Sequence, residues 1–273
     1  MSGNDSVMRF LYGTVPGRAA LGLIQKTRAE RVAVRFLHSP LSRPLIARFA
    51  RAHHIPEDQW RGRKFRSCRE FFIRRLDRDA DMTPDHLISP CDGWLSVFPI
   101  EETSSFSIKR SRYRVADLLG DAQLAERFRG GMCMIFRLCA SDYHRYCFID
   151  DAVLGENHFI PGVLHSVQPI ACERYPVYTL NRRSWCRMDT EHFGTVVQTE
   201  IGALVVGGIV NHHANCAVHR GEEKGYFDLA GSTITLFFEP GRVTLRPEFA
   251  RALRDCDEVR VERGQWIGNG GRA

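Results

Sequence analysis

The sequence predicts an α+β protein in which a basic, amphipathic helical N-terminal region precedes a β-rich core of antiparallel or mixed sheets. Up to about residue 56, apolar residues recur at helical spacing with arginines between them. From about residue 88 onward, short β-branched or aromatic runs are bounded by turns. The 273 residues, 44% of them hydrophobic, are enough for one large domain or two small ones. We place the division so that the two regions are 1–85 and 86–273.

The N-terminal region is expected to contain two or three short helices between residue 8 and about residue 56. Prolines at three positions interrupt the apolar pattern, and proline breaks a helix interior. Such basic amphipathic helices either cover the protein's own core or lie in the interface of an anionic membrane. The pattern leaves both interpretations open. The apolar residues are Leu21, Leu23, Ile24, Val32, Val34, Phe36, Leu45, Ile46 and Phe49, and the prolines are Pro16, Pro40 and Pro44.

Positive charge is concentrated in the same region. Between Ser6 and Pro56, nine basic residues accompany the single acid Glu30, a net charge of +8. The whole chain carries +6, so the remainder sums to −2. Basic charge confined to one end indicates a partner there. Nucleic acid is not the expected partner, because no recognised binding motif accompanies the charge.

The second region is expected to consist mainly of strands. Four runs are β-branched or aromatic and bounded by turns, namely 94–98, 132–138, 195–199 and 232–238. A helix is expected over 115–128. The glycine-rich tail from Gly268 to Ala273 is expected to be frayed.

Several classes of protein are not expected from this sequence. The longest apolar run, Ile201–Val210, is too short and too rich in glycine to span a bilayer. The first residues are polar and do not form a signal peptide, so neither a secreted nor an integral membrane protein is expected. Nine cysteines without a CxxC pair indicate reduced thiols, and histidines without HExxH spacing do not indicate a metal site.

Three polar clusters stand next to strand-like runs. Asp92 lies in the stretch Ser89–Gly93, His144 lies in Ser141–Cys147, and Ser232 follows Gly231 between the runs 224–229 and 232–238. Each cluster has an ordinary explanation. Asp-Gly and Gly-Ser are common turn pairs, the flanking runs could form a hairpin, and a lone histidine is usually structural.

An acid, a histidine and a serine can also form a relay that activates the serine hydroxyl. Serine is a poor nucleophile at neutral pH, histidine accepts its proton, and the acid orients the ring and stabilises its charged form. Any large protein offers such a trio by chance. Spacing alone therefore does not decide between the two interpretations.

The order and content of several motifs resemble the phosphatidylserine decarboxylase proenzymes, a family of self-cleaving, pyruvoyl-dependent enzymes. The matching stretches occur in one order over most of the chain. They are FFIRRL at 71–76, SPCDG at 89–93, FSIKRSRY at 106–113, SDYHR at 141–145, PGVLHSV at 161–167, EIGA at 200–203, GEEKGYF at 221–227 and AGST at 230–233.

The resemblance implies that the Gly231–Ser232 bond is cut by the serine itself. Ser232 would attack the Gly231 carbonyl to give an ester, and elimination and hydrolysis would leave a pyruvoyl group at position 232. The products would be a long chain, 1–231, and a short chain, 232–273, that stay together. A glycine before the serine is reasonable, because the attack needs a distorted peptide that a residue without Cβ tolerates easily.

The resemblance also implies the activity and its setting. Phosphatidylserine would be decarboxylated to phosphatidylethanolamine through a Schiff base to the pyruvoyl cofactor, with His144 as proton donor and with Asp92 and His144 serving the earlier self-cleavage. The expected location is the cytoplasmic face of the cell membrane, where the basic helices would dock on anionic lipid. Phe10, Leu11, Tyr12 and 21–24 are the residues expected to insert, and a homodimer is plausible by analogy.

The chain departs from the family pattern at one important position. Many members carry a second histidine three residues after the one in DYHR, and here that position is Cys147. Either His144 serves both steps, or another residue such as His165 supplies the base. Tyr143 is a further neighbour of the relay or the substrate. The usual leucine before GST is Ala230.

Two other functions remain open. The same pyruvoyl machinery could decarboxylate a soluble amino acid, or the chain could be an uncleaved, silent relative that associates with membranes.

Overall fold

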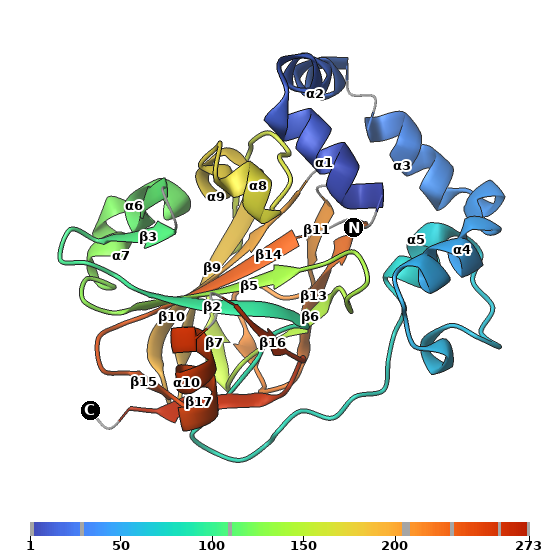
Figure 1. Cartoon of the computed structure of the whole chain (residues 1–273). Coiled ribbons are helices and arrows are strands. Elements are labelled where there is room, and N and C mark those ends of the chain that lie inside the picture. The colour runs from blue at the N-terminus through green and yellow to red at the C-terminus, as the bar shows by residue number, and fades with distance from the viewer. Residues whose placement is uncertain are drawn as a thin grey trace.

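The computed structural model describes residues 3–27, 30–108, 111–203, 208–229, 232–255 and 258–271 (Figure 1). Helices dominate the first part of the chain and antiparallel strands the rest, so the predicted α+β class is confirmed. In Figure 1, the first helices lie over one end of the sheets and the next ones beside them.

The N-terminal region holds more helices than the sequence predicted, and they begin earlier. Pro16 lies beside a helix boundary, as predicted, since α1 ends at Gly13 and α2 begins at Val15. It lies in the first turn of α2, where proline is tolerated because that N–H has no partner within the helix. The elements are α1 (Gly3–Gly13), α2 (Val15–Thr27), α3 (Glu30–His38), η1 (Pro40–Ser42), α4 (Leu45–Ala52), η2 (Glu57–Gln59) and α5 (Cys68–Phe72).

The four runs predicted as strands are strands in the structure, as β2, β5, β10 and β14. The strands of the core are β1 (His86–Ile88), β2 (Gly93–Pro99), β3 (Ser105–Ile108), β4 (Ser111–Arg114), β5 (Met132–Leu138), β6 (Arg145–Cys147), β7 (Ala152–Leu154), β8 (His158–Ile160), β9 (Arg183–Thr190), β10 (Gly194–Ile201), β11 (Gly208–Asn211), β12 (Ala217–Val218), β13 (Glu223–Asp228), β14 (Ser232–Phe238), β15 (Val243–Leu245), β16 (Val259–Val261) and β17 (Trp266–Gly270).

Two other predictions were wrong. The helix expected over 115–128 is divided, because Gly120 is left-handed at φ 67° and Asp121 caps a new helix. The first half of the tail expected to be frayed, 268–270, belongs to β17, which pairs with both β1 and β15, while Arg272 and Ala273 lie outside the described residues. The helices of the core are α6 (Val115–Leu119), α7 (Ala122–Glu126), α8 (Pro169–Cys172), α9 (Val177–Leu180) and α10 (Pro247–Asp255).

A central sheet organises the core. Among the described residues it has nine strands, in the order β12-β7-β9-β10-β14-β5-β2-β16, with β8 paired to β9. Smaller sheets, β1-β17-β15 and β11-β13-β6, contribute to the first hydrophobic core on one of its faces. Helices α1, α6, α8 and α9 and the β3–β4 hairpin contribute to the second hydrophobic core on the other face. Alternate residues of β14 therefore enter different cores, with Ile234 in the first and Phe237 in the second.

The runs on either side of the Gly-Ser pair do not form a hairpin. Strand β13 pairs with β11 and β6, whereas β14 lies between β10 and β5 in the central sheet. The chain therefore passes from one sheet to another between Leu229 and Ser232. A break there would leave β14 paired on both sides.

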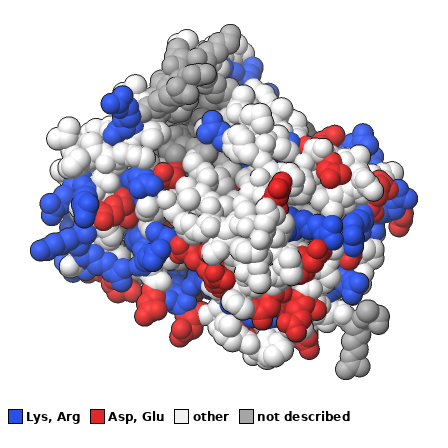
Figure 2. Space-filling view, turned by 180° about the vertical axis from the view of Figure 1, so that it is seen from behind, with Lys and Arg blue, Asp and Glu red and all other residues white. Residues whose placement is uncertain are grey.

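Apolar side chains are exposed on the outer faces of the N-terminal helices. Phe10 and Leu23 are exposed, but Leu11, Tyr12 and Leu21 are buried in the second core, so these three were wrongly expected to insert into a membrane. Exposed arginines lie among the apolar residues, and Figure 2 shows many basic side chains on the side of the molecule where α3 to α5 lie. Within the described part of the chain, no helix combines the length and apolar character needed to cross a bilayer.

Candidate active site

The sequence motifs meet at one edge of the central sheet. Ser232, the first residue of β14, is opposite Leu138, the last residue of β5. Trp94 is opposite Arg137, which places Gly93 at the start of β2 beside Leu138. The neighbouring β10 ends there too, with Ile201 opposite Thr233. Because adjacent strands are about 4.8 Å apart, Gly93 and Ser232 lie about 10 Å apart across β5. We call this edge, formed by Gly93, Leu138, Ile201 and Ser232, the site edge.

Asp92 lies at the site edge, immediately before β2, and is almost fully buried. Both of its carboxylate oxygens accept from Arg78 Nη1 at 2.8 Å. One of them also accepts from the backbone N–H of Arg263 at 2.9 Å. In the described part of the chain these donors, and not the His144 ring, hold the carboxylate. Asp92 therefore does not orient the His144 ring, and its negative charge only opposes the lowering of the pKa of His144.

His144 is completely buried in the turn that follows β5. Its Nδ1 lies 2.9 Å from the carbonyl oxygen of Asp142. A carbonyl can only accept, so Nδ1 carries the proton and Nε2 carries the lone pair. Among the described residues, Nε2 has no hydrogen-bond partner. Burial lowers the pKa of His144 to about 4, while Asp142 and Asp92 oppose that shift. The ring is thus neutral at pH 7, with a free basic nitrogen.

Ser232 is 1% exposed, and its hydroxyl has no hydrogen-bond partner among the described residues. Its side chain lies on the same face of β14 as Ile234, the face of the first core. Gly231 and Ala230, the other residues of the predicted cleavage motif, lie outside the described residues. Just before them, Leu229 has φ 63°, a backbone conformation that costs a non-glycine residue about 1–3 kcal/mol.

Helices of the N-terminal region cover this part of the site. The Phe72 ring lies against the His144 ring, with centroids 4.0 Å apart. Phe72 and Leu229 form a buried apolar cluster onto which Val34 and Leu37 of α3 pack. Arg69 also holds Asp228 at 2.8 Å. The N-terminal region is therefore in direct contact with His144 and with Leu229, the residue just before the predicted cleavage motif.

Cys147, at the position where the resemblance predicts a histidine, is a buried thiol. Its sulfur lies 3.6 Å from the Pro90 carbonyl oxygen. Burial raises the pKa of the thiol, although the Arg263 guanidinium opposes this, so Cys147 is protonated at neutral pH. A neutral thiol is not a general base. Tyr143 is also buried, and its ring lies below Arg78 while its hydroxyl accepts from the Leu76 N–H.

His165 lies on the opposite flank of β14 from Asp92. Asn181 links it to the end of β10, since the Asn181 side chain bonds the backbone of both His165 and Gly202. The His165 ring stacks on Tyr175 with centroids 4.5 Å apart, and burial lowers its pKa. Gly202 follows Ile201 at the site edge. His165 is therefore near that edge but does not belong to the cluster of Asp92 and Cys147.

Several partners of the site carry no signal in the sequence. Arg78 and Arg263, which hold Asp92, come from an extended segment and a turn, and neither carries a periodic signal. Phe72 belongs to the FFIRRL stretch, but nothing in that stretch indicates its contact with His144. A buried ion pair, Lys224 Nζ to Glu200 Oε1 at 2.7 Å, was also missed, because a charged residue in a strand ordinarily indicates an exposed position.

Two hollows adjoin these residues. One, of about 220 Å³, lies beside Tyr143 and is lined by three arginines, of which Arg75 and Arg145 pair with Glu223. The other, of about 250 Å³, lies on the second-core face of the sheet and includes Arg137. Within the described ranges, no group of three or more histidine, cysteine or acidic side chains is placed to hold a metal ion.

Comparison with known proteins gives a consistent result. The sequence profile of the family described as phosphatidylserine decarboxylase matches residues 67–268. A protein of Clostridium acetobutylicum named phosphatidylserine decarboxylase proenzyme 2 is 37% identical over 96% of this chain and 91% of its own length. Proenzymes of the same name from Clostridium novyi and Desulfitobacterium hafniense are 34% and 32% identical, each over 97% of this chain and 92% of its own length.

Proposed function

The chain belongs to the phosphatidylserine decarboxylase family, and from that premise we propose that it cuts itself at Gly231–Ser232 and then decarboxylates phosphatidylserine. The observation that carries this proposal is the pair of buried, unpartnered groups at the site, the Ser232 hydroxyl and His144 Nε2. A buried polar group without a partner costs about 1–3 kcal/mol. Thr233 Oγ1 and His165 Nδ1, near the same sheet edge, are also without a partner among the described residues, and such a concentration of costly groups fits a reaction better than a structural role.

In the first step, Ser232 Oγ attacks the carbonyl carbon of Gly231 and its proton passes to His144 Nε2. The peptide nitrogen leaves with a proton, so that an ester replaces the amide. Loss of the Ser232 α-proton then expels the Gly231 carboxylate and leaves dehydroalanine. Water converts the dehydroalanine to a pyruvoyl group and ammonia.

His144 is suited to act as the base in this step. Its Nδ1–H is fixed by the Asp142 carbonyl, so Nε2 is the nitrogen that accepts the proton. The charge that results is stabilised by the fields of Asp142 and Asp92, which favour the protonated ring. Cys147 is protonated and cannot compete for this role. His165, the alternative base, lies beside the end of β10 and not in the cluster of Asp92 and Cys147. We therefore assign both proton transfers, in cleavage and in decarboxylation, to His144.

Position 232 fits a pyruvoyl group because it is dry and held by strands on both sides. When formed, the group supplies a carbonyl that withdraws electrons from the substrate's amine-bearing carbon. The protein's part is to exclude water and to hold the proton donor. Pairing of β14 with β10 and β5 from Ser232 to Phe238 supports retention of the short chain after the break.

The N-terminal surface supports a lipid substrate at an anionic membrane. Val15, Leu23 and Val32 are 71%, 62% and 73% exposed, and Arg35, Arg43 and Arg48 are exposed on the same run of helices. Exposed apolar residues bounded by basic ones are typical of interfacial helices. The inner face of α3 packs on Leu229, so the membrane-facing surface would be one helix away from the site.

The experiment that tests the function begins with the intact mass of the purified protein. We expect two fragments that meet between Gly231 and Ser232, the smaller one lacking the serine nitrogen. The variant Ser232→Ala should remain a single chain, and the exposed Ser107→Ala should be cut like the wild type. Carbon dioxide release from phosphatidylserine, and not from free serine, then identifies the substrate. A single intact wild-type chain would refute the proposal.

A further inference from the structure

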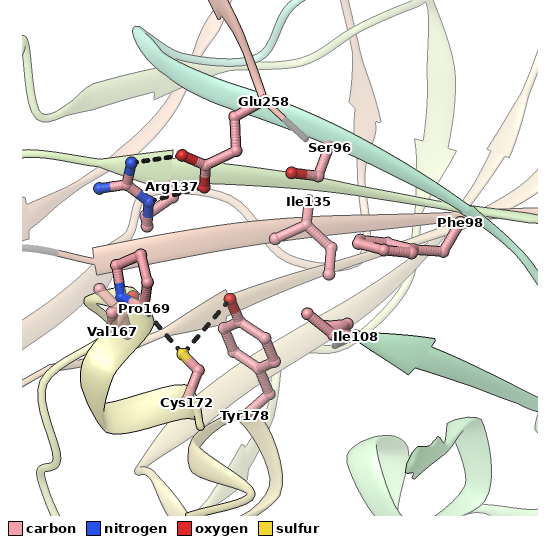
Figure 3. A pocket seen from close by; sticks show the side chains of 10 residues that line it. All are labelled: Ser96, Phe98, Ile108, Ile135, Arg137, Val167, Pro169, Cys172, Tyr178 and Glu258. Atoms are coloured by element: carbon pink, nitrogen blue, oxygen red, sulfur yellow. Dashed lines mark hydrogen bonds and ion pairs between the residues drawn. The ribbon is translucent and has the colours of Figure 1, made fainter. Parts of the chain in front are cut away.

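The second-core face of the central sheet carries a cavity of about 250 Å³ (Figure 3). Its floor is formed by β2 and β5, and the opposite wall comes from α8 and α9 and the segment before them. The end of β3 also contributes. The lining residues are Ser96, Phe98, Ile108, Ile135, Arg137, Val167, Pro169, Cys172, Tyr178 and Glu258.

The lining is apolar except near one end. The side chains of Ile135, Val167 and Tyr178 form part of its walls and are buried. The charged side chains are Arg137 and Glu258, which pair with each other at 2.9 and 2.7 Å. Figure 3 shows Arg137 on the opposite side of the cavity from Phe98 and Ile108. Because the charges of Arg137 and Glu258 cancel each other, the cavity has no net charge. It therefore fits an aliphatic ligand with a polar group at the Arg137 end.

That polar end adjoins the site edge. Arg137 is opposite Thr233, one residue from the pair of Ser232 and Leu138. Phe98 is opposite Cys133, four residues further along β5. At about 3.4 Å per residue, the cavity extends about 13 Å away from the site along the sheet. The Ser232 side chain faces the first core, on the other side of the sheet. A ligand whose reactive group lies at position 232 therefore has to pass around the end of β14 to lay an apolar tail in this cavity.

We propose that this cavity binds one acyl chain of the phospholipid substrate and so sets the enzyme's preference for chain length. The identity of the ligand rests on the proposed function. The space is larger than the roughly 150 Å³ apolar cavity that holds a benzene ring, so a segment of acyl chain fits. Each methylene buried there strengthens binding by up to about fourfold.

Steady-state kinetics with short-chain lipids test the proposal. We expect kcat/KM to rise at least tenfold from dibutanoyl- to dioctanoyl-phosphatidylserine, both below their micelle concentrations. Cys172→Phe and, at the half-buried rim, Ile108→Trp fill the cavity and should remove most of that rise. Both should still cleave themselves. The matched control is Val153→Trp on β7, where the side chain is 64% exposed.

The proposal is overturned if the filled variants keep the wild-type chain-length preference, or if Val153→Trp loses it equally. The use of two filling variants covers the failure of either one to fold.

A binding measurement separates this proposal from the proposed function. Dioctanoyl-phosphatidylcholine has neither the carboxylate nor the primary amine of the substrate, so calorimetry with it does not depend on turnover. We expect the wild type to bind it at least tenfold more tightly than the dibutanoyl lipid, and the filled variants to lose that difference. If this result holds but phosphatidylserine is not decarboxylated, the cavity assignment stands and the assigned reaction is wrong. Equal binding of both lipids by the wild type would refute the cavity assignment.

Discussion

The N-terminal helices and the start of β14 differ in where their polar groups lie: the helices expose them to water, and the start of β14 buries them. On the helices, arginines such as Arg35, Arg43 and Arg48 are exposed to water next to exposed apolar residues. At the site, Ser232 and His144 are buried, and each keeps a polar atom without a hydrogen-bond partner among the described residues. A solvated charge contributes little to stability, but a dry polar group is costly and reactive. We therefore propose that the N-terminal surface provides attraction to the membrane and that the edge of the sheet provides the chemistry.

The two regions meet at the apolar cluster of Phe72 and Leu229. Helix α5 places Phe72 on the His144 ring, and α3 contacts the same cluster with Val34 and Leu37. Residues of the N-terminal region therefore contribute to the burial that lowers the pKa of His144. Each region can be altered separately, and the expected effects decrease from the site to the surface.

The largest effect is expected for His144→Gln. Loss of a general base slows a reaction by about 10²- to 10⁴-fold, so self-cleavage should slow by that factor. The rate is measured from the appearance of the short chain after synthesis of the proenzyme. His219→Gln, at an exposed histidine, should leave it unchanged. Self-cleavage of His144→Gln at the wild-type rate would refute this assignment of the base.

The pH dependence sharpens the same assignment. With a pKa of about 4, His144 is in its basic form above that pH. The wild-type cleavage rate should be constant from about pH 5 to 8 and fall as the pH drops through about 4. A rate that rises through pH 6.5 or above would instead indicate a base with a normal or raised pKa.

A smaller loss, of stability, is expected when the buried ion pair is broken. Lys224 and Glu200 are both fully buried, and Asn211 and Tyr146 complete their surroundings. Lys224→Met leaves the Glu200 carboxylate uncompensated, which should lower the free energy of unfolding by about 3–5 kcal/mol. Urea denaturation in the uncleaved Ser232→Ala background measures the change.

The matched control breaks an exposed ion pair. Arg187→Met removes the partner of Asp189, where both side chains are about half exposed, and should cost about 0–1 kcal/mol. Equal losses in the two variants would mean that burial does not determine how much an ion pair contributes to stability.

The sequence predicted the fold class, the four central strands and the three polar clusters, because strand runs and turn residues are local signals. It did not predict that β13 and β14 belong to different sheets, since the pairing of a strand depends on partners far along the chain. The two arginines that hold Asp92 were missed for the same reason. Arg78 and Arg263 are 14 and 171 residues away from it. Burial of Leu11 and Tyr12 was missed because an amphipathic pattern does not specify which surface its apolar face meets.

The smallest effects are expected at the N-terminal surface. Each basic side chain near an anionic bilayer contributes about 1 kcal/mol, or about fivefold in binding. Replacing Arg35, Arg43 and Arg48 by glutamine should therefore reduce binding to vesicles of phosphatidylglycerol and phosphatidylcholine by about 100-fold at low salt. Cosedimentation measures the bound fraction, and the exposed Arg187→Gln on β9 is the control. Self-cleavage of the triple variant should match the wild type, since its mechanism uses none of these side chains. Unchanged vesicle binding would show that these arginines do not bind the membrane. Slower self-cleavage would show that the N-terminal surface and the site are coupled through α3.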